Sequence, residues 1–480
     1  MGLWTAWIST AIGFYYAVVS GWTLKYFQLG ITGALNGEDV DTTEVWNAFL
    51  QSPGQVIFFQ FVVILLVLGT IWKGAKAIEK VNFYLMISLF ALLFLTLFLS
   101  LWMDMSDGSL DGALFMFTVD FDMLMEPEVW INGLSQSAWS CSAGMGMCIT
   151  YAVYMSKDED TVLNAFTMGL ANNSISIIAG LAVLSAIFAV NPDPLATVTG
   201  GSSAITFLAL PEVFAQAPGG AIGPLIMTAM FFLALSFAAL TSMISTVELC
   251  VRNFVDHGYE RERSVLITGL ALFIFGLPSA ILWIKLDSSG VAFPEFLEVQ
   301  DHIWGYGLMF SGLFIAFSIW KYGYVKWRAA VDEGTAPPGF AGYLGLGVSA
   351  FRDDFINTGD NDLEVGRWWD VLIYIAFPVL FFILMASYFS DMIANTPNVW
   401  DPANPKGLSI ILLFWGVVAA LFIGLNKKLI ERPLFRNVPE GADADISELP
   451  GGSDELVGQV GDVIVGFEHL TDSLDAELAD

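Results

Sequence analysis

Small and polar residues interrupt an otherwise apolar stretch at residues 129–155. The interruption reads QSAWSCSAGMG over residues 136–146, and it contains Gly144 and Gly146. Each glycine disfavours a helix interior by about 1 kcal/mol relative to alanine, so the helix is predicted to unwind there. Within a membrane, freed carbonyls can coordinate a cation and freed amides can hold an anion, as in the midplane sites of secondary transporters. Close helix packing through small residues is the alternative that composition leaves open.

Two further polar clusters lie in apolar stretches, at residues 161–190 and 221–247. Their amide and hydroxyl members are Asn172, Asn173, Ser176, Thr241, Ser242, Ser245 and Thr246. Each cluster alone is explained by hydrogen bonds between helices, but three together favour a shared polar cavity. Oxygen ligands of this kind suit an alkali cation rather than a transition metal. The sequence shows no constellation of histidines, cysteines and carboxylates that indicates hydrolytic or redox catalysis, so we expect no enzyme.

Long apolar stretches must position these residues. The chain has 480 residues, of which 56% are hydrophobic and 14% charged, whereas about 25% is usual in soluble proteins. A bilayer-spanning helix needs roughly 20 apolar residues, and ten stretches approach or exceed this length. They cover residues 3–28, 53–72, 81–103, 129–155, 161–190, 221–247, 264–284, 303–320, 369–390 and 407–426. Because backbone groups in lipid must bond internally, these stretches predict an all-α integral membrane protein.

The basic residues indicate the orientation of these spans. Alternate loops and the segment after the last span hold 16 of the 19 lysines and arginines, and the opposite loops and their edges hold only Lys25, Lys285 and Lys406. Basic loops face the cytoplasm. The pattern therefore predicts an even number of spans in the plasma membrane, with both termini cytoplasmic.

The chain is also strongly acidic, with a formal net charge of −29. The acids gather in the outer loops and in a tail that holds 12 of them after Arg436 and no lysine or arginine. We interpret this excess as surface solvation, typical of a salt-loving source, and expect no nucleic-acid partner. Within the tail, Phe467, Leu470, Leu474 and Leu478 recur at helical spacing, which fits either a short amphipathic helix or a disordered tail. The three cysteines lie in or beside apolar spans and are interpreted as packing residues.

Several motifs together resemble the neurotransmitter:sodium symporter family. In chain order they are residues 14–24 (FYYAVVSGWTL), 77–82 (AIEKVN), 127–130 (PEVW), 144–151 (GMGMCITY), 157–160 (KDED), 210–214 (LPEVF) and 238–242 (AALTS). Each motif alone is weak, but their shared order and spacing are specific over about residues 4–426.

The resemblance implies an inverted-repeat fold of five plus five helices followed by two more. Residues 1–103 match family helices three to five, residues 104–328 an outer loop and the second repeat, and residues 329–430 the two further helices. Residues 431–480 are then an acidic cytoplasmic tail. The first two family helices have no counterpart, and we expect that the true start of the reading frame lies upstream of Met1.

The resemblance also implies site residues. It places the substrate against Tyr16, whose hydroxyl meets a carboxyl group, with Ile12, Trp139, Ser142, Met145 and Thr246 around it. It assigns one sodium ion to the Ala238 carbonyl with Thr241 and Ser242, and the other to Ser140 and Asn172. For the substrate residues, a plain packing or structural role remains the alternative.

Two assignments concern chloride and an outer gate. Gln136, Ser140, Asn172 and Ser176 match the chloride site of chloride-dependent members, and the neutral serine at 176 leaves room for an anion that balances sodium. Asp301 approximates the extracellular gate acid, and a solvated loop acid is the alternative. Glu248 matches a common family position without a predicted role in transport.

Two functions remain open at this stage. The first is sodium-coupled, chloride-dependent symport of an amino acid or related small zwitterion by alternating access. The second is a ten-helix membrane protein that binds or regulates without transport, because the missing helices carry about half of the expected ligands. The upstream reading frame separates them, since an apolar, glycine-broken helix there favours the transporter. The sequence does not determine the substrate or the oligomeric state.

Overall fold

The computed structural model describes residues 2–36, 40–155, 159–198, 202–287, 289–358 and 361–430. The long helices are α1 Gly2–Thr32, α3 Pro53–Ile71, α4 Ala75–Asp104, α6 Pro127–Ser140, α8 Thr161–Val190, α12 Ile222–Asp256, α13 Arg261–Ile281, α14 Glu295–Asp332, α18 Phe377–Asn395 and α19 Leu408–Ile430. The short helices are α2 Thr42–Leu50, α5 Asp111–Phe117, α7 Met147–Ala152, α9 Pro194–Val198, α10 Ser202–Ala204, α11 Leu210–Phe214, α15 Phe340–Gly342, α16 Val348–Phe351 and α17 Arg367–Val371. Single 3₁₀ or π turns are η1 Met105–Asp107, η2 Met123–Met125, η3 Ile205–Ala209, η4 Tyr343–Gly347, η5 Arg352–Ile356 and η6 Leu372–Ala376. Strands β1 Ile284–Leu286 and β2 Ala292–Pro294 form an antiparallel pair.

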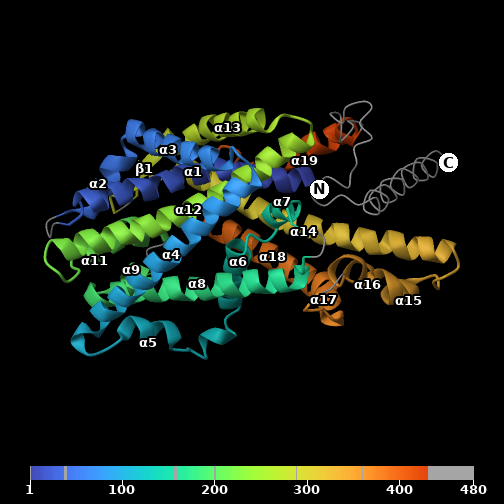
Figure 1. Cartoon of the computed structure of the whole chain (residues 1–480), viewed down its shortest axis with the longest axis horizontal. Coiled ribbons are helices and arrows are strands. Elements are labelled where there is room, and N and C mark those ends of the chain that lie inside the picture. Colours follow the sequence, from blue (N-terminus) through green and yellow to red (C-terminus); the bar gives the residue numbers. More distant parts are fainter. Residues whose placement is uncertain are drawn as a thin grey trace.

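The helices form one elongated bundle (Figure 1). Among the described residues, nine helical segments are long and apolar enough to cross a membrane, and they match nine of the ten predicted spans. The remaining predicted span, residues 129–155, is divided between α6 and α7. The all-α prediction is therefore confirmed, and the β1–β2 hairpin is a small addition in an outer loop.

The two ends of the bundle separate as the loop charges predict. At one end, the Trp46 indole donates to the Ala292 carbonyl at 2.7 Å, which joins α2 to β2. At the other end, the Arg261 guanidinium donates to the Ile71 carbonyl at 2.7 Å, so the basic loops after α3 and before α13 lie together. The N-terminal end of α1 lies at this second end, with α7 and α15 to α17 (Figure 1). We call it the cytoplasmic end.

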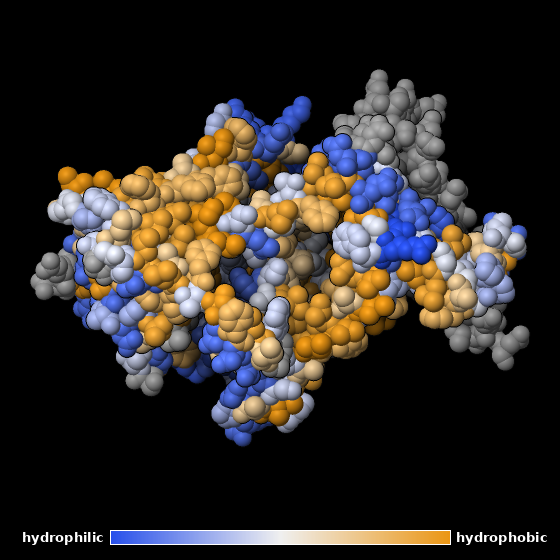
Figure 2. All heavy atoms as spheres, turned by 90° about the horizontal axis from the view of Figure 1, so that it is seen from below, coloured by the Kyte–Doolittle hydropathy of each residue, from blue (hydrophilic) through white to orange (hydrophobic). Residues whose placement is uncertain are grey.

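Helix α1 is the centre of the core and packs against α3, α12, α13 and α14. Its side chains Ile8, Val18 and Tyr26 are fully buried. At Gly21 the helix approaches α3 so closely that a Cβ atom would lie 2.9 Å from the backbone nitrogen of Gln60. By contrast, α4 exposes large apolar residues such as Phe98, which is 66% exposed. Figure 2 shows such apolar surface along the sides of the bundle, as expected of residues that face lipid, around a polar hollow near the centre of this face.

The cytoplasmic start of α8 is fixed by one carboxylate. Asp160 caps the helix, because its Oδ1 accepts from the Leu163 amide at 2.8 Å, and its Oδ2 accepts from the Asp362 amide at 2.7 Å. These amide contacts, that of Leu163 first, hold the pKa of Asp160 below its ordinary value. The charged form is therefore favoured, and it joins α8 to the loop before α17.

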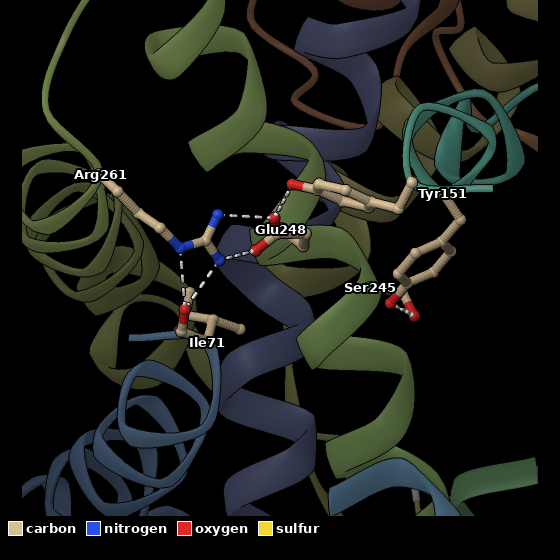
Figure 3. A network of polar contacts seen from close by, with 6 residues as sticks. Ile71, Tyr151, Ser245, Glu248 and Arg261 are labelled. Carbon is tan, nitrogen blue, oxygen red and sulfur yellow. Dashed lines mark hydrogen bonds and ion pairs between the residues drawn. The ribbon is translucent and has the colours of Figure 1, made fainter. Parts of the chain in front are cut away.

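A buried ion pair joins three helices near the cytoplasmic end (Figure 3). The fully buried Glu248 of α12 accepts from both terminal nitrogens of Arg261 of α13, at 3.0 and 2.7 Å. Arg261 also donates to the Ile71 carbonyl at the end of α3, and the Tyr154 hydroxyl donates to Glu248 at 2.6 Å. Every charged oxygen therefore has a partner, which is the condition under which a buried pair is tolerated.

Two sequence interpretations need comment. The described cysteines are free thiols, as expected, but Cys148 is exposed, so a packing role does not apply to it. Its sulfur lies 3.9 Å from the Met168 sulfur of α8. The proposed amphipathic helix at residues 467–478 lies outside the described residues.

Removing Arg261 should destabilise the protein strongly. Arg261→Ala leaves Glu248 buried without its cation, and we expect a loss of about 3–5 kcal/mol in the free energy of unfolding. The matched control is Arg328→Ala, because the side chains of Arg328 and its partner Asp332 are 60% and 65% exposed and the pair is worth less than about 1 kcal/mol. Thermal unfolding in detergent measures both variants. Equal losses of stability in the two variants would contradict the claim that burial makes the Arg261–Glu248 pair the stronger one.

Candidate functional site

The break predicted in residues 136–146 is present. Helix α6 ends at Ser140, α7 begins at Met147, and Ser142, Gly144 and Gly146 between them have φ values of 55°, 81° and 79°. Left-handed backbone of this kind favours glycine. At Gly144 the chain also approaches α14 closely, since a Cβ atom would lie 2.8 Å from the Gly312 amide nitrogen. The two glycines therefore allow both the unwinding and the close contact.

Neighbouring helices take up polar groups of the broken segment. The buried Ser9 of α1 donates to the Met145 carbonyl at 2.5 Å. On the other side, the Asn172 amide of α8 donates to the Ser140 hydroxyl at 2.7 Å. The first bond satisfies a backbone carbonyl that the break leaves without a helical partner, and together the two bonds fix the unwound segment between α1 and α8.

A cavity of about 430 Å³ lies beside the break, among α1, α4, α7 and α12. Nine predicted site residues line it: Ile12, Tyr16, Trp139, Ser140, Ser142, Met145, Thr241, Ser242 and Thr246. Ile12 and Tyr16 are four residues apart on α1 and so share one face of that helix. The structure thus brings together residues that are more than two hundred positions apart in the chain.

Five lining residues were not predicted as site residues: Asn82, Met86, Met147, Tyr151 and Ser245. Asn82 and Met86 come from α4, and their sequence signal is a single amide at the start of an apolar span. Tyr151 and Ser245 lie in recognised motifs or polar clusters, but only the fold shows that they face the cavity. No charged side chain and no histidine is among the described lining residues.

The residues assigned to sodium by resemblance fall into two places. On α12, the Thr241 hydroxyl donates to the Ala238 carbonyl at 2.9 Å, and Ser242 lies beside the cavity. On the opposite wall, Ser140 and Asn172 are in direct contact. Both groups offer neutral oxygen atoms, which are the ligands that alkali cations prefer. Within the described residues, no cluster of three or more His, Cys, Asp or Glu residues could hold a transition metal.

The four residues assigned to chloride are only partly gathered. Ser140 and Asn172 are in contact, and the Ser176 hydroxyl donates to the Asn172 carbonyl at 3.0 Å. Gln136 lies one turn before Ser140 on α6, and both Gln136 and Ser176 have exposed side chains. The described residues therefore form an open surface here rather than an enclosed anion site.

Asp301 lies close to the outer end of the cavity. The buried Tyr15 donates to its Oδ1 at 2.7 Å. A Cβ atom at Gly305 would lie 3.3 Å from the same oxygen and 3.0 Å from the Trp139 ring, so Asp301 and Trp139 border the same glycine. This position is at the outer end of α14, next to the site, although the Asp301 side chain itself is exposed.

Comparison with known proteins decides the family. The model of the sodium:neurotransmitter symporter family matches residues 49–341. The chain belongs to this family. It is therefore a multi-pass membrane protein of a family of secondary transporters, not an enzyme, and the predictions of family, fold class and membrane location are confirmed.

Similar family members come from distant organisms. A sodium-dependent transporter of Bacillus subtilis is 30% identical over 330 residues, which cover 66% of this chain and 70% of that protein. A mouse sodium- and chloride-dependent neutral and basic amino acid transporter is 24% identical over 72% of this chain and 56% of its own length. The crystal structure of MhsT in complex with L-phenylalanine is similar with a TM-score of 0.63 and 25% identity, over 80% of each chain.

Replacing Gly144 should disturb the break of this symporter-family protein. In Gly144→Ala the left-handed backbone costs roughly 1–2 kcal/mol, and the new methyl group collides with the Gly312 backbone, so we expect a lower apparent melting temperature and weaker substrate binding. The control is Gly169→Ala in α8, where no atom lies within 4 Å of an added Cβ and helix propensity favours alanine by about 1 kcal/mol. Thermal unfolding in detergent compares the two variants. An unchanged melting temperature in Gly144→Ala would refute the claim that alanine is strained at this position.

Proposed function

We propose that the protein is a sodium-coupled symporter of neutral amino acids with large apolar side chains, acting across the plasma membrane by alternating access. The observation that carries this proposal is the central cavity. It combines an apolar wall, an unwound backbone segment at a helix break and neutral oxygen ligands, and none of its described lining residues is charged.

The cavity lining supports the class of substrate. Trp139, Met86, Met145, Met147 and Ile12 offer apolar contacts, and thioether side chains adapt to different apolar shapes. A charged substrate side chain would find no partner of opposite charge among the described lining residues. The mouse relative is named for neutral and basic amino acids and MhsT was crystallised with L-phenylalanine, which agrees with an amino-acid substrate here.

The charges of the amino acid itself need separate partners. We propose that the Tyr16 hydroxyl donates to the substrate carboxylate. Bound sodium, held by Ser140 and Asn172 on one wall and by Ala238, Thr241 and Ser242 on the other, then balances negative charge in a region of low dielectric constant. Asp301 with Tyr15 serves as the outer gate in this arrangement.

The domain division follows from the same proposal. We assign residues 1–103 to the first repeat and residues 104–328 to an outer loop and the second repeat, with residues 329–430 as two further helices. The broken helix and α8 would move against α1 and α12, which form the packed core. Alternating access requires this kind of relative motion around a fixed midplane site.

Uptake measurements test the proposal directly. Proteoliposomes with the protein from its full reading frame should accumulate labelled phenylalanine, leucine or methionine only with an inward sodium gradient, and should not accumulate lysine. Loss of one hydrogen bond to a charged group costs about 1.5–3 kcal/mol, so Tyr16→Phe should raise KM by about 10-fold or more. Tyr84→Phe, on the exposed side of α4, is the control. Sodium-dependent binding without uptake would instead support the binding or regulatory alternative.

Chloride dependence is a separate proposal. Gln136, Ser140, Asn172 and Ser176 provide neutral donors and no carboxylate, so we propose that an anion joins them when sodium binds. Uptake should fall at least several-fold when gluconate replaces chloride, and Ser176→Glu should restore it by supplying a fixed negative charge. Ser174→Ala, an exposed hydroxyl two residues away, is the control. Unchanged uptake in gluconate would refute the proposal.

A further inference from the structure

A carboxylate is buried at the outer end of α4, far from the central cavity. Asp104 is the last residue of α4 and is only 2% exposed. It lies about 27 Å along the helix from Met86 of the cavity wall. Among the described residues, no lysine or arginine forms an ion pair with it. Asp104 therefore has no side-chain cation as a partner there, and it has no part in the transport sites proposed above.

The described hydrogen-bond donors to Asp104 are neutral. The Gly112 amide at the start of α5 donates to Oδ2 at 3.2 Å and to Oδ1 at 3.4 Å, and the Ala113 amide also faces the carboxylate. Gly112 can come this close because a Cβ atom there would lie only 2.6 Å from the Ser185 Cα atom of α8. Helix α5 thus lies along α8 and covers the carboxylate (Figure 1). A carboxylate can accept about four hydrogen bonds, so part of its capacity is left.

Two serine hydroxyls beside Asp104 are buried and unpaired. Ser100 precedes Asp104 by one turn of α4 and shares its face of the helix. Ser185 on α8 faces the carboxylate. Both serines are fully buried, and neither hydroxyl makes a well-formed hydrogen bond to any described residue. Since an unsatisfied buried hydroxyl costs about 1–3 kcal/mol, two of them around one carboxylate indicate a missing common partner.

The surroundings make a lone negative charge costly. Met103 precedes Asp104 and Ala186 follows Ser185, and both belong to a buried apolar cluster with Ile187. An ionised carboxylate in such a place needs a compensating charge. A proton can neutralise the carboxylate but gives only one new hydrogen bond. A cation can take the carboxylate and both serine hydroxyls as ligands at once, so it accounts for all of these groups together.

The ligand types indicate a monovalent alkali ion. Carboxylate and hydroxyl oxygens are hard ligands, which suit alkali and alkaline-earth ions rather than transition metals. Calcium ions take six to eight oxygen ligands, commonly with several carboxylates, whereas Asp104 supplies a single negative charge that balances one positive charge. The exposed Asp111 adds negative charge close by, which favours the approach of a cation from the outer side.

We propose that Asp104, Ser100 and Ser185 bind a sodium ion at the outer end of the bundle, and that this ion fastens α5 to α4 and α8. A helix of seven residues is not stable alone, so the position of α5 depends on contacts of this kind. The chain continues from α5 through η2 into α6, and the ion thereby fixes the outer approach to the broken helix. The site is separate from the central cavity and does not depend on transport.

Hydrogen–deuterium exchange of the backbone amides at residues 111–117 measures this fastening on the full chain in lipid nanodiscs. Sodium chloride replaces N-methylglucamine chloride at constant ionic strength and pH. Because opening of α5 releases the ion, exchange should slow about 10-fold at a sodium concentration about ten times the half-saturating value. Asp104→Asn should abolish the sodium effect. Asp122→Asn, which changes an exposed acid before α6, is the control and should keep it.

Serine variants distinguish a bound ion from plain packing. Ser100→Ala and Ser185→Ala should each raise the half-saturating sodium concentration about 2- to 10-fold, as the loss of one neutral ligand predicts. Ser106→Ala, which removes an exposed hydroxyl just after α4, should leave it unchanged. Without an ion, removal of an unpaired buried hydroxyl should leave the sodium response as it is. Unchanged half-saturation in both buried-serine variants would therefore overturn the proposal.

Two further outcomes bear on the identity and place of the bound ion. Ser242→Ala removes a proposed ligand of the central sodium and should leave the sodium response of α5 intact. Loss of that response would show that it is relayed from the central cavity, and would overturn the separate site. Protection of α5 that follows pH but not sodium would assign a proton to Asp104 and would also overturn the proposal. None of these outcomes depends on uptake, so failure of the transport function is distinguished from failure of this site.

Discussion

The structure depends on one constraint: a helix is interrupted where water cannot satisfy its backbone. Between Ser140 and Met147 the regular hydrogen bonds are lost, and each unpaired polar group in lipid would cost several kcal/mol. Part of the solution is local, because left-handed Gly144 and Gly146 let the chain turn back on itself. The Met145 carbonyl is satisfied from another helix, by Ser9 on α1, and Asn172 on α8 holds the Ser140 side chain at the end of α6. The unwound segment is therefore held between α1 and α8, and the cavity lies beside it, among α1, α4, α7 and α12.

The cavity is polar without being charged, and this has an electrostatic consequence. Charge–charge interactions in a region of low dielectric constant are several-fold stronger than in water, so a fixed carboxylate among Thr241, Ser242 and Asn172 would bind a cation too firmly to release it. Neutral carbonyls and hydroxyls hold a cation less firmly than a carboxylate does. Under the proposed function, the carboxylate of an amino-acid substrate would add to the binding of the cation. Coupled binding of ion and substrate would then follow from the neutral lining.

The sequence predicted the spans well because lipid leaves little freedom. Residues 161–190 were predicted as one span, and α8 has these bounds, since an apolar run in a bilayer has to be helical. The break was predictable because glycine and serine are poor helix formers wherever they occur. Span ends were less predictable: α14 extends to Glu295–Asp332, beyond the predicted residues 303–320, because helices continue into water where hydropathy gives no signal. The parts played by Asn82 and Met86 depend on how α4 packs against the break, which no local pattern records.

Burial gives the two polar contacts at the cytoplasmic end different strengths. Glu248 is fully buried and bonded to both Arg261 and Tyr154, and separating such a pair costs about 3–5 kcal/mol. The Tyr151–Ser245 contact joins neutral groups that both border the cavity, where water can replace a partner, and it is worth about 0.5–1.5 kcal/mol. A contact of the first kind cannot be broken in each cycle of a transporter without slowing it severely, whereas one of the second kind can. The ion pair therefore fixes α3, α12 and α13 as a rigid unit, and Tyr154, in the turn directly after α7, joins the end of α7 to that unit through Glu248.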